Sequence, residues 1–336
     1  MTETAKDFRI REFDGSDADY EGLVAVANAL EPESPTCVER IRHRDEAREK
    51  QYLFKRVLVE RDGRIVASAN YGESNWSHVP GKYTLYISVH PEYGNRGIGT
   101  AVYEYIVQKL ADADPAPNCY ATWVREDRPV ALDFVEKRGF KEIMRENEST
   151  LTLERFDAGP FGDLIAGVRN AYEVERLDRL MERDPEALRK LYDLDWIAMQ
   201  DMPNDDPPVR RRFETYLKIM QPPGFDPRLG YVAVNGDEWV GATLLWHNPA
   251  EPDVLGTEIT GVLREHRRRG IATALKVLTI ADAKELGYRK IRTANAATNP
   301  MYDINVRLGF EPEPGWIVYH RRLDDEAAGE DTEISS

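Results

Sequence analysis

One pattern of landmarks occurs twice along this chain, and the repeat limits the possible folds more than any other feature of the sequence. In each half a strand-like segment, a glycine hairpin, an Arg-Gly turn and a Gly-Phe pair follow in the same order. The two Arg-Gly turns are 270 − 97 = 173 residues apart, and the two Gly-Phe pairs are 309 − 139 = 170 residues apart. Ordered landmarks at nearly constant spacing indicate a tandem duplication. The paired segments are Phe8–Asp14 with Tyr172–Asp178, Val59–Ala67 with Val232–Gly241, Arg96–Thr100 with Arg269–Thr273, and Arg138–Phe140 with Leu308–Phe310.

Each repeat is predicted to be an α/β unit. Segments of alternating apolar and polar residues, bounded by glycine turns, are typical of strands, and apolar residues at helical spacing are typical of helices. The predicted strands include Tyr83–Val89, Cys119–Val124, Lys141–Leu153, Gly256–Val262, Lys290–Asn295 and Trp316–Arg321. The predicted helices include Ile98–Leu110, Pro129–Lys137, Ile271–Leu286 and Pro300–Arg307.

Glycine and proline interrupt the pattern at Asp157–Pro160, between the two repeats. We therefore predict an N-terminal domain over residues 1–156 and a C-terminal domain over residues 165–323. The last residues, 324–336, carry six acidic side chains and no basic one, which predicts a disordered acidic tail.

Composition restricts the partners that this chain is expected to have. With 41% hydrophobic residues it can form folded cores, and its net charge of −15 argues against nucleic acid or an anionic membrane as the main partner. The same charge permits a cationic substrate. Cys37 and Cys119 show no metal-binding or disulfide spacing, and no apolar segment approaches membrane-spanning length. We expect a cytoplasmic protein without a metal, either monomer or homodimer.

A basic glycine turn is the main candidate binding site. Three arginines, Arg267 to Arg269, precede Gly270, and a helix is predicted from Ile271. A helix that begins in a glycine turn offers unpaired N–H groups and a positive dipole end, which suit a pyrophosphate. The spacing of the glycines is neither that of dinucleotide-binding folds nor that of the P-loop. A nucleotide-binding dehydrogenase is therefore excluded.

The spacing Arg267-x-x-Gly270-x-Ala272 resembles the coenzyme A pyrophosphate loop of the GCN5-related N-acetyltransferases (GNAT). The segments Thr293–Phe310 and Asp201–Pro203 resemble a bacterial branch of this family, and the tandem plan resembles that of mycothiol synthase. The resemblance covers nearly the whole chain. It implies an α/β (α+β) fold of two tandem acyl-CoA N-acyltransferase domains, each a mixed splayed β-sheet flanked by helices.

The resemblance also implies acetyl-CoA as cosubstrate and direct attack by an amine. Glu258, on the central strand, would be the base, and strand alternation predicts that it shares a face with Thr260 and Val262. The residues that would bind acetyl-CoA are Thr260, Gly261, Val262, Arg267, Arg268, Arg269, Gly270, Ile271, Ala272, Thr273, Asn295 and Asn299, with Arg96, Gly97, Ile98, Gly99 and Thr100 as the corresponding nest of the first repeat. Asn299 can also serve only as a helix cap.

Three positions depart from the family pattern. Asn305 stands where many members have a tyrosine that protonates the leaving thiolate, and Val135 stands there in the first repeat. Asparagine can donate a hydrogen bond but cannot release a proton usefully, so water or Tyr302 would be needed. Gly94 replaces the first basic residue of the first loop. The first repeat is therefore expected either to bind CoA without turnover or to shape the acceptor site.

We predict an N-acetyltransferase that acetylates a primary amine of a small molecule, with Asp201 in an acidic loop that contacts the substrate. The alternative is a non-catalytic acyl-CoA-binding or regulatory protein, which the missing tyrosines favour. The sequence leaves the acceptor open among an antibiotic, a polyamine, an aminoacyl-sugar thiol precursor, an amino acid and a peptide terminus.

Overall fold

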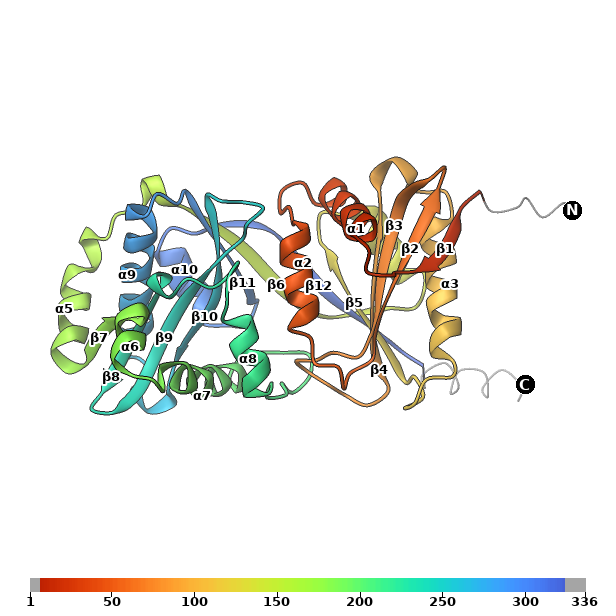
Figure 1. The fold of residues 1–336 in the computed structure, drawn as a ribbon. Coiled ribbons are helices and arrows are strands. Elements are labelled where there is room, and N and C mark those ends of the chain that lie inside the picture. The colour runs from red at the N-terminus through yellow and green to blue at the C-terminus, as the bar shows by residue number, and fades with distance from the viewer. Residues whose placement is uncertain (1–6, 324–336) are drawn as a thin grey trace, which may run out of the picture. The chain divides into compact units, whose positions relative to one another are not determined.

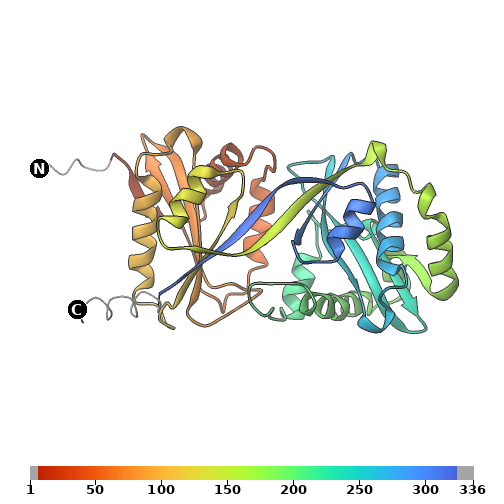
Figure 2. The ribbon, with the colours of Figure 1, turned by 180° about the vertical axis from the view of Figure 1, so that it is seen from behind.

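The computed structural model describes residues 7–323, which divide into two compact units. Within that range unit 1 contains residues 7–42, 48–144 and 317–323, and unit 2 contains residues 43–47 and 145–316. The predicted acidic tail, 324–336, lies outside the described residues. In each unit helices flank a mixed β-sheet (Figure 1 and Figure 2). No helix within the described range is both long and apolar enough to cross a membrane.

The sheet of unit 1 has the strand order β1-β2-β3-β4-β5-β12. The pairs β1–β2, β2–β3 and β3–β4 are antiparallel, and β4 and β5 are parallel. In chain order the elements of the first half are β1 (Arg9–Glu12), α1 (Asp17–Leu30), α2 (Val38–Glu46), β2 (Phe54–Arg61), β3 (Arg64–Gly72), β4 (Lys82–Val89), η1 (Pro91–Tyr93), α3 (Ile98–Leu110), β5 (Cys119–Arg125), α4 (Pro129–Glu136) and β6 (Lys141–Thr152).

The sheet of unit 2 has the order β6-β11-β10-β9-β8-β7 and repeats the plan of unit 1. Its one parallel pair is β10 with β11 among the register pairs described. The elements are η2 (Leu153–Arg155), η3 (Gly159–Phe161), α5 (Gly162–Ala171), β7 (Glu173–Arg176), α6 (Leu177–Arg183), α7 (Ala187–Gln200), α8 (Phe213–Ile219), η4 (Pro227–Leu229), β8 (Gly230–Asn235), β9 (Glu238–His247), β10 (Val254–Val262), η5 (Arg264–His266), α9 (Ile271–Glu285), β11 (Lys290–Ala296), α10 (Met301–Arg307) and β12 (Glu311–Arg322).

Two long strands are divided between the units. Strand β6 begins in unit 1, and its residues from 145 onward belong to unit 2, where they pair with β11. Strand β12 begins in unit 2, and its residues from 317 onward belong to unit 1, where the strand adjoins β5. Each sheet is thus completed by a strand that follows the other half's Gly-Phe pair.

The two Arg-Gly turns have the same backbone conformation. Asn95 and Gly97 have φ values of 57° and 77°, and Arg268 and Gly270 have 58° and 80°. In both turns a short 3₁₀ helix precedes the pair of left-handed residues and an α-helix begins directly after the glycine. Left-handed φ at the glycine is needed to turn the chain into the helix, and glycine adopts it without a steric cost. The duplication therefore extends to the local geometry of the turns.

Helices cover both faces of the unit 2 sheet. On one face α7 packs so closely that a Cβ added to Gly261 would lie 2.4 Å from Ala198. On the other face a Cβ added to Gly241 would lie 3.0 Å from Ile271 of α9 and 3.2 Å from Val262. Neighbouring residues on a strand point to opposite faces. We call these the α7 face and the α9 face.

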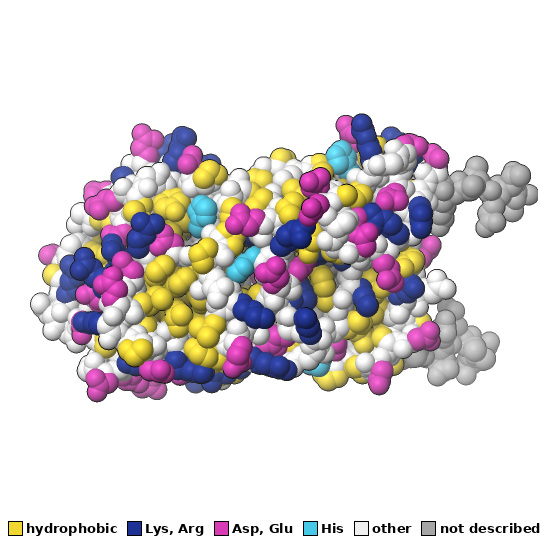
Figure 3. All heavy atoms as spheres, in the orientation of Figure 1, with side chains coloured by type: hydrophobic (Ala, Val, Ile, Leu, Met, Phe, Trp, Pro, Cys, Tyr) yellow, Lys and Arg dark blue, Asp and Glu magenta, His cyan; other side chains and the backbone are white. Residues whose placement is uncertain are grey.

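Charge on the surface is mixed. On the face drawn in Figure 3, Lys and Arg side chains are interspersed with Asp and Glu side chains over both units. The net charge of −15 is therefore not gathered into one acidic field on this face.

Candidate functional site

The two central strands of unit 2 separate after a short pairing. Strands β10 and β11 pair only from Val254 with Lys290 to Gly256 with Arg292. Beyond that point β11 continues to pair with β6 as far as Ala296, and β10 continues to pair with β9 as far as Val262. The edge of β10 that faces β11 is therefore left without strand partners beyond Gly256. Such an edge can accept an extended molecule through main-chain hydrogen bonds.

The N-terminus of α9 lies at the far end of this edge. Gly270 precedes the helix in a left-handed conformation, and no side chain caps the helix. The first intrahelical bond runs from Ala274 N to Gly270 O. The amides of Ile271, Ala272 and Thr273 are consequently among the unpaired donors that a helix start presents to an anion. Leu164 of α5 borders the turn, 3.3 Å from a Cβ placed on Gly270.

The three predicted arginines have different surroundings. Arg267 is ion-paired with Asp201 and donates from Nε to Val262 O at 2.9 Å. Arg269 donates to the Tyr172 hydroxyl at 3.1 Å and to the Glu265 carbonyl at 3.1 Å. Arg268 is exposed and has no hydrogen-bond or ion-pair partner among residues 7–323. Arg268 is therefore the arginine of this turn whose donors are available to a phosphate.

Asp201 fixes the turn from the end of α7. Its carboxylate binds both Arg264 and Arg267, and the Arg264 hydrogen bond contributes most to lowering the pKa of the carboxyl. The expected contact of Asp201 with substrate stays a prediction. The contacts present in the structure are with the arginines of the turn.

A β-bulge singles out Glu258. Two flanking residues of β10 face consecutive residues of β9, so Glu258 is the extra residue of its strand. Bulges re-aim side chains and interrupt strict alternation. The flanking pairs are Thr257 with Leu245 and Ile259 with Leu244.

The bulge changes the face on which Glu258 was expected. Its negative charge helps to raise the pKa of Asp195 in α7 and of Tyr216 in α8, which requires Glu258 to lie near both. Val262 instead packs toward Ile271 on the α9 face. The prediction that Glu258 and Val262 share one face was therefore wrong, because simple alternation does not hold across a bulge.

Asp195 is a functional candidate that the sequence reasoning missed. Burial raises the pKa of its carboxyl to about 7, the charge of Glu258 adds to the increase, and Arg211 opposes it. Asp195 stands four residues after buried Leu191 and three before Ala198, on the helix face that packs on β10. A carboxylate at that spacing in an amphipathic helix was the available signal.

Further carboxylates lie toward the same face from β6. Burial raises the pKa of Glu146, and the charges of Asp205 and Glu148 raise it further. Glu146 pairs with Ala296 and Glu148 with Ala294, the strand positions that alternate with Asn295. Asp205 lies in the acidic loop identified from the sequence. The α7 face of the splayed strands is therefore acidic.

The asparagines lie on the opposite face. Asn305 of α10 is fully buried and donates from Nδ2 to Asn295 Oδ1 of β11 at 2.7 Å. The Oδ1 atom of Asn305 is buried and has no donor. Asn299 Oδ1 accepts from Met301 N at 2.9 Å, in the turn that leads into α10, whose N-cap residue is Pro300. The structure thus brings Asn295 and Asn305 together and engages Asn299 in the start of α10.

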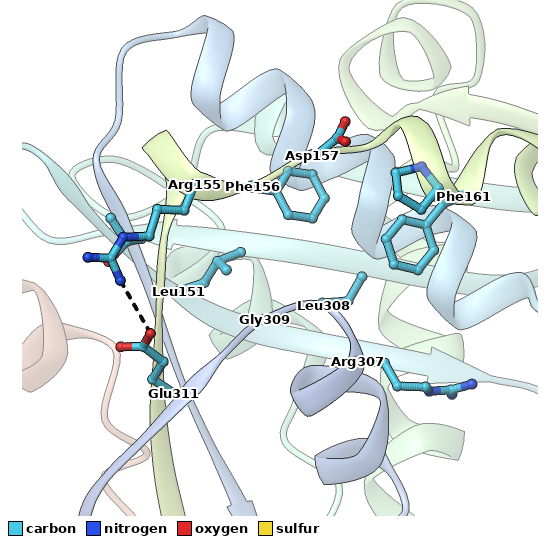
Figure 4. Close-up of a pocket in the computed structure, with 11 residues that line it drawn as sticks. Leu151, Arg155, Phe156, Asp157, Phe161, Arg307, Leu308, Gly309 and Glu311 are labelled. Atoms are coloured by element: carbon cyan, nitrogen blue, oxygen red, sulfur yellow. Dashed lines mark hydrogen bonds and ion pairs between the residues drawn. The ribbon is translucent and has the colours of Figure 1, made fainter.

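A pocket of about 380 Å³ lies beside the C-terminal end of α10, and none of the predicted site residues lines it. The rings of Phe156 and Phe161 lie on one side and the Leu308–Gly309 turn on the other (Figure 4). Arg155 and Glu311 form an ion pair at 3.4 Å at its edge. Within residues 7–323 no group of three or more His, Cys, Asp and Glu side chains could hold a metal ion.

The corresponding nest in unit 1 is in contact with Phe134 of α4 and with Arg138 just after it. A Cβ added to Gly99 would lie 3.4 Å from Phe134. The guanidinium of Arg138 lies 3.6 Å from the centre of the Phe134 ring and donates to Thr100 Oγ1 at 2.7 Å. Side chains of α4 therefore pack against the first turn of α3, which contains Ile98, Gly99 and Thr100. Arg96 lies over the Tyr93 ring, and Gly97 has open space around it.

The central strand of unit 1 also lacks the features of β10. Strands β4 and β5 separate after Thr84 and Ala121, as β10 and β11 do. Strand β4 pairs with β3 without a bulge and carries no carboxylate. Glu258, which forms a carboxylate pair with Asp195 in unit 2, thus has no counterpart on this strand.

The acetyltransferase (GNAT) family model matches the chain twice, over residues 20–140 and 188–310. The chain belongs to this family. Both matches include an Arg-Gly turn, and together they span most of the sequence. The fold class and the tandem GNAT arrangement expected from the sequence are confirmed.

Solved structures show the same fold at low identity. A GCN5-related N-acetyltransferase from Sphaerobacter thermophilus has a TM-score of 0.70 at 18% identity, with 95% of this chain and 96% of that chain covered. A tandem GNAT protein from the clavulanic acid biosynthesis pathway has a TM-score of 0.73 at 21% identity, with 94% and 98% covered. The glucosamine N-acetyltransferase region of a fungal β-N-acetylglucosaminidase scores 0.68 at 15% identity, with 95% and 38% covered. No curated protein matches the sequence.

Proposed function

We propose that unit 2 of this GNAT protein transfers an acetyl group from acetyl-CoA to a primary amine of a small cationic molecule. One observation carries the proposal: the unpaired edge of β10 runs from an uncapped helix N-terminus to a pair of carboxylates. These are the anion site, the extended groove and the proton acceptor that acetyl transfer to an amine needs.

The donor fits the residues of the turn and the strand edge. The amides of Ile271, Ala272 and Thr273 suit the pyrophosphate, and the small side chain of Ala272 allows close approach. Arg268 can add charge-assisted hydrogen bonds. The arm of the donor would lie along the unpaired edge of β10 near Thr260 and bind its backbone. Acetyl-CoA supplies the activated acyl group, and the chain holds it in place.

Proton removal is assigned to the carboxylate pair. An ammonium has no lone pair, so the acceptor must lose a proton before it attacks. Asp195 has a pKa of about 7, close to the operating pH at which a general base is most effective. Two neighbouring carboxylates favour retention of one proton between them. Glu258, exposed at the bulge, would meet the amine, and Asp195 would share the proton that Glu258 takes up.

The acidic α7 face supports a cationic acceptor. Glu146, Glu148 and Asp205 add negative charge on the side of the sheet where Asp195 and Glu258 lie. Carboxylates at the entrance of a site raise the local concentration of a cation and orient it. We expect a diamine or polyamine to be a better acceptor than a neutral amine of the same length.

Unit 1 is proposed to have no turnover. Phe134 and Arg138 pack against the start of α3, where the donor would approach the nest. Strand β4 has no carboxylate to accept a proton. Unit 1 would support the fold, since strand β6 begins in it and completes the sheet of unit 2.

The test is release of CoA thiol from acetyl-CoA in the presence of an amine panel. The panel contains polyamines, amino sugars, amino acids and peptides, each matched to an analogue with a hydroxyl in place of the amine. We expect thiol release with cationic amines and none with the hydroxyl analogues. Binding of acetyl-CoA without release by any amine would favour the alternative, a non-catalytic acyl-CoA-binding protein.

A further inference from the structure

A buried lysine of α9, the helix whose start would bind the donor, has no assigned role. Lys276 is only 3% exposed and lies in the second turn of α9. It forms no ion pair and no hydrogen bond with any of residues 7–323. An ammonium buried without a counter-charge is costly and is rarely kept without a function.

The position of Lys276 directs it toward the donor. It follows Ala272 by four residues, so both side chains lie on the same side of the helix. Ala272 belongs to the turn that would hold the pyrophosphate, and Lys276 is one helical turn further along α9. The next residue on this stripe, Ile280, packs in one cluster with Leu308 and Phe310, after α10. Lys276 therefore lies on the side of α9 that faces α10.

Lys276 also lies close to the position that lacks its acid. Its Nζ is 5.6 Å from the centre of the Phe310 ring. The Phe310 amide donates to the Asn305 carbonyl at 3.0 Å, so the lysine and Asn305 are linked through one residue. The Asn305 amide is already committed to Asn295, and its buried Oδ1 has no donor. Asn305 thus supplies no acid to this site, and Lys276 is a nearby side chain that carries a proton.

The same cluster places Lys276 near the point where the strands part. Leu255 and Ile291 pair with each other one residue before β10 and β11 separate. Both pack in the cluster that contains Phe310 and Val277, the residue after Lys276. The acyl end of a donor that enters from the helix N-terminus along β10 would come to rest at this point.

We propose that Lys276 is the general acid of unit 2, and that its ammonium gives a proton to the thiolate that leaves during acetyl transfer. This assignment rests on the proposed function. The amine nitrogen forms a bond to the acyl carbon, and the carbon–sulfur bond breaks with its electron pair on sulfur. The sulfur takes a proton from Lys276 Nζ. The acceptor's ammonium loses one proton to the carboxylate pair before attack. The second proton, lost as the amide forms, leaves through the same pair to solvent, and solvent returns a proton to the neutral lysine.

The environment of Lys276 matches this role. Burial alone lowers the pKa of its ammonium to about 8, and no charged group contributes to the change. The surrounding side chains are those of Phe310 and the apolar cluster. A thiol has an ordinary pKa of roughly 8.5, so proton transfer from such a lysine to a thiolate is nearly balanced.

The experiment compares Lys276→Met with wild type and with Lys284→Met as the matched control. Lys284 is an exposed lysine of the same helix whose Nζ donates to the Glu154 and Phe156 carbonyls. Calorimetry measures acetyl-CoA binding, a thiol assay measures turnover between pH 6 and 10, and thermal unfolding measures stability. Methionine keeps the volume of the lysine stem and removes the charge.

We expect Lys276→Met to melt at a higher temperature than wild type, to bind acetyl-CoA within about threefold, and to turn over roughly 10²-fold more slowly. The fall of the wild-type rate above about pH 8 should be absent in this variant. Lys284→Met should keep wild-type turnover. A Lys276→Met protein with wild-type turnover and pH profile would overturn this inference alone. If wild type does not bind acetyl-CoA, the proposed function and the inference fail together.

Discussion

Single buried charges give the proposed site its chemistry and lower its stability. Burial raises the pKa of Asp195 to about 7 and lowers that of Lys276 to about 8, from opposite directions. Both groups thereby become able to exchange protons near neutral pH. Periodicity can mark such a residue as a charged break in an apolar stripe, but it does not show that burial shifts the pKa of the side chain. The catalytic candidate that the sequence did locate, Glu258, stands on a strand whose pattern was clear.

Replacement of Glu258 by Gln should lower kcat by roughly 10²–10⁴ if the carboxylate accepts the amine proton. It should also move the acidic limb of the pH–rate profile to lower pH, because the charge of Glu258 helps to hold the pKa of Asp195 up. The measurement is the profile of both proteins between pH 5 and 9. Asp193→Asn, at an exposed position of α7, the helix that carries Asp195, is the control and should leave the limb in place. If the acidic limb does not move, the charge of Glu258 does not influence the pKa of Asp195.

Asp195→Asn should be more stable than wild type at neutral pH. The folded pKa of Asp195 lies above its unfolded value, so the folded state binds more protons between about pH 4 and 7 and loses stability as pH rises through that window. We expect a gain on the order of 2 kcal/mol in the free energy of unfolding at pH 8, and almost none at pH 4. Denaturant unfolding at the two pH values measures the difference. An equal effect at both would contradict the pKa shift.

At the scale of elements, sequence periodicity predicted the regular helices and strands and missed the bulge that interrupts β10. The helix α3 begins and ends at Ile98 and Leu110 as predicted, and β4, β5, β11 and α4 differ from their predicted ranges by one residue at an end. The bulge in β10 was not predictable, because Ile259 is the one apolar side chain between Gly256 and Gly261, which is too little to show where the alternation is interrupted. The pairing of Asp201 with Arg264 and Arg267 was also hidden, since those residues are more than sixty positions apart.

The Asp201 pairings predict how the loop and the turn depend on each other. Asp201→Asn should weaken acetyl-CoA binding several-fold, because it releases Arg264 and Arg267 and loosens the turn before α9. The arginines are exposed, so the loss of stability should stay within about 1 kcal/mol. The lowered pKa of Asp201 means that this loss is present at neutral pH and disappears as pH falls through the carboxyl's folded pKa. A raised KM for the amine with unchanged acetyl-CoA affinity would instead support the substrate contact predicted from the sequence.

The two glycine turns offer a matched pair of variants. Gly270 and Gly97 have φ values of 80° and 77°, so alanine at either position incurs a similar backbone strain of about 1 kcal/mol. A Cβ at Gly270 meets Leu164 at 3.3 Å, whereas one at Gly97 meets nothing within 4 Å. We expect Gly270→Ala to weaken acetyl-CoA binding at least tenfold and Gly97→Ala to leave it nearly unchanged. Calorimetry on both variants tests this, and the opposite order would move the donor site to unit 1.

At the scale of the whole molecule, the sequence shows the duplication but not the proposed difference in activity between the two units. The repeated landmarks predicted two units of one plan, and the two family matches agree. Which unit a final strand completes could not be predicted, because a half-buried strand has the same pattern whichever sheet it joins. Strands β6 and β12 each begin in one unit and end in the other. The contacts of Phe134 and Arg138 with the start of α3 were equally hidden, since they join residues more than thirty positions apart.

The proposal that unit 2 alone binds the donor tightly predicts one acetyl-CoA per chain. The starts of α3 and α9 both lack a side-chain cap, but the bulge and the carboxylate belong to β10 of unit 2 and are missing from β4 of unit 1, where α4 also packs on the start of α3. Titration calorimetry should give a stoichiometry near one, and Gly270→Ala should reduce the heat of that site while Gly97→Ala retains it. Phe134→Ala, which removes the ring beside Gly99, should leave turnover unchanged even if it admits a second, weaker equivalent of donor. Two tight sites in wild type would contradict this proposal, and would make unit 1 a second donor site rather than a supporting half.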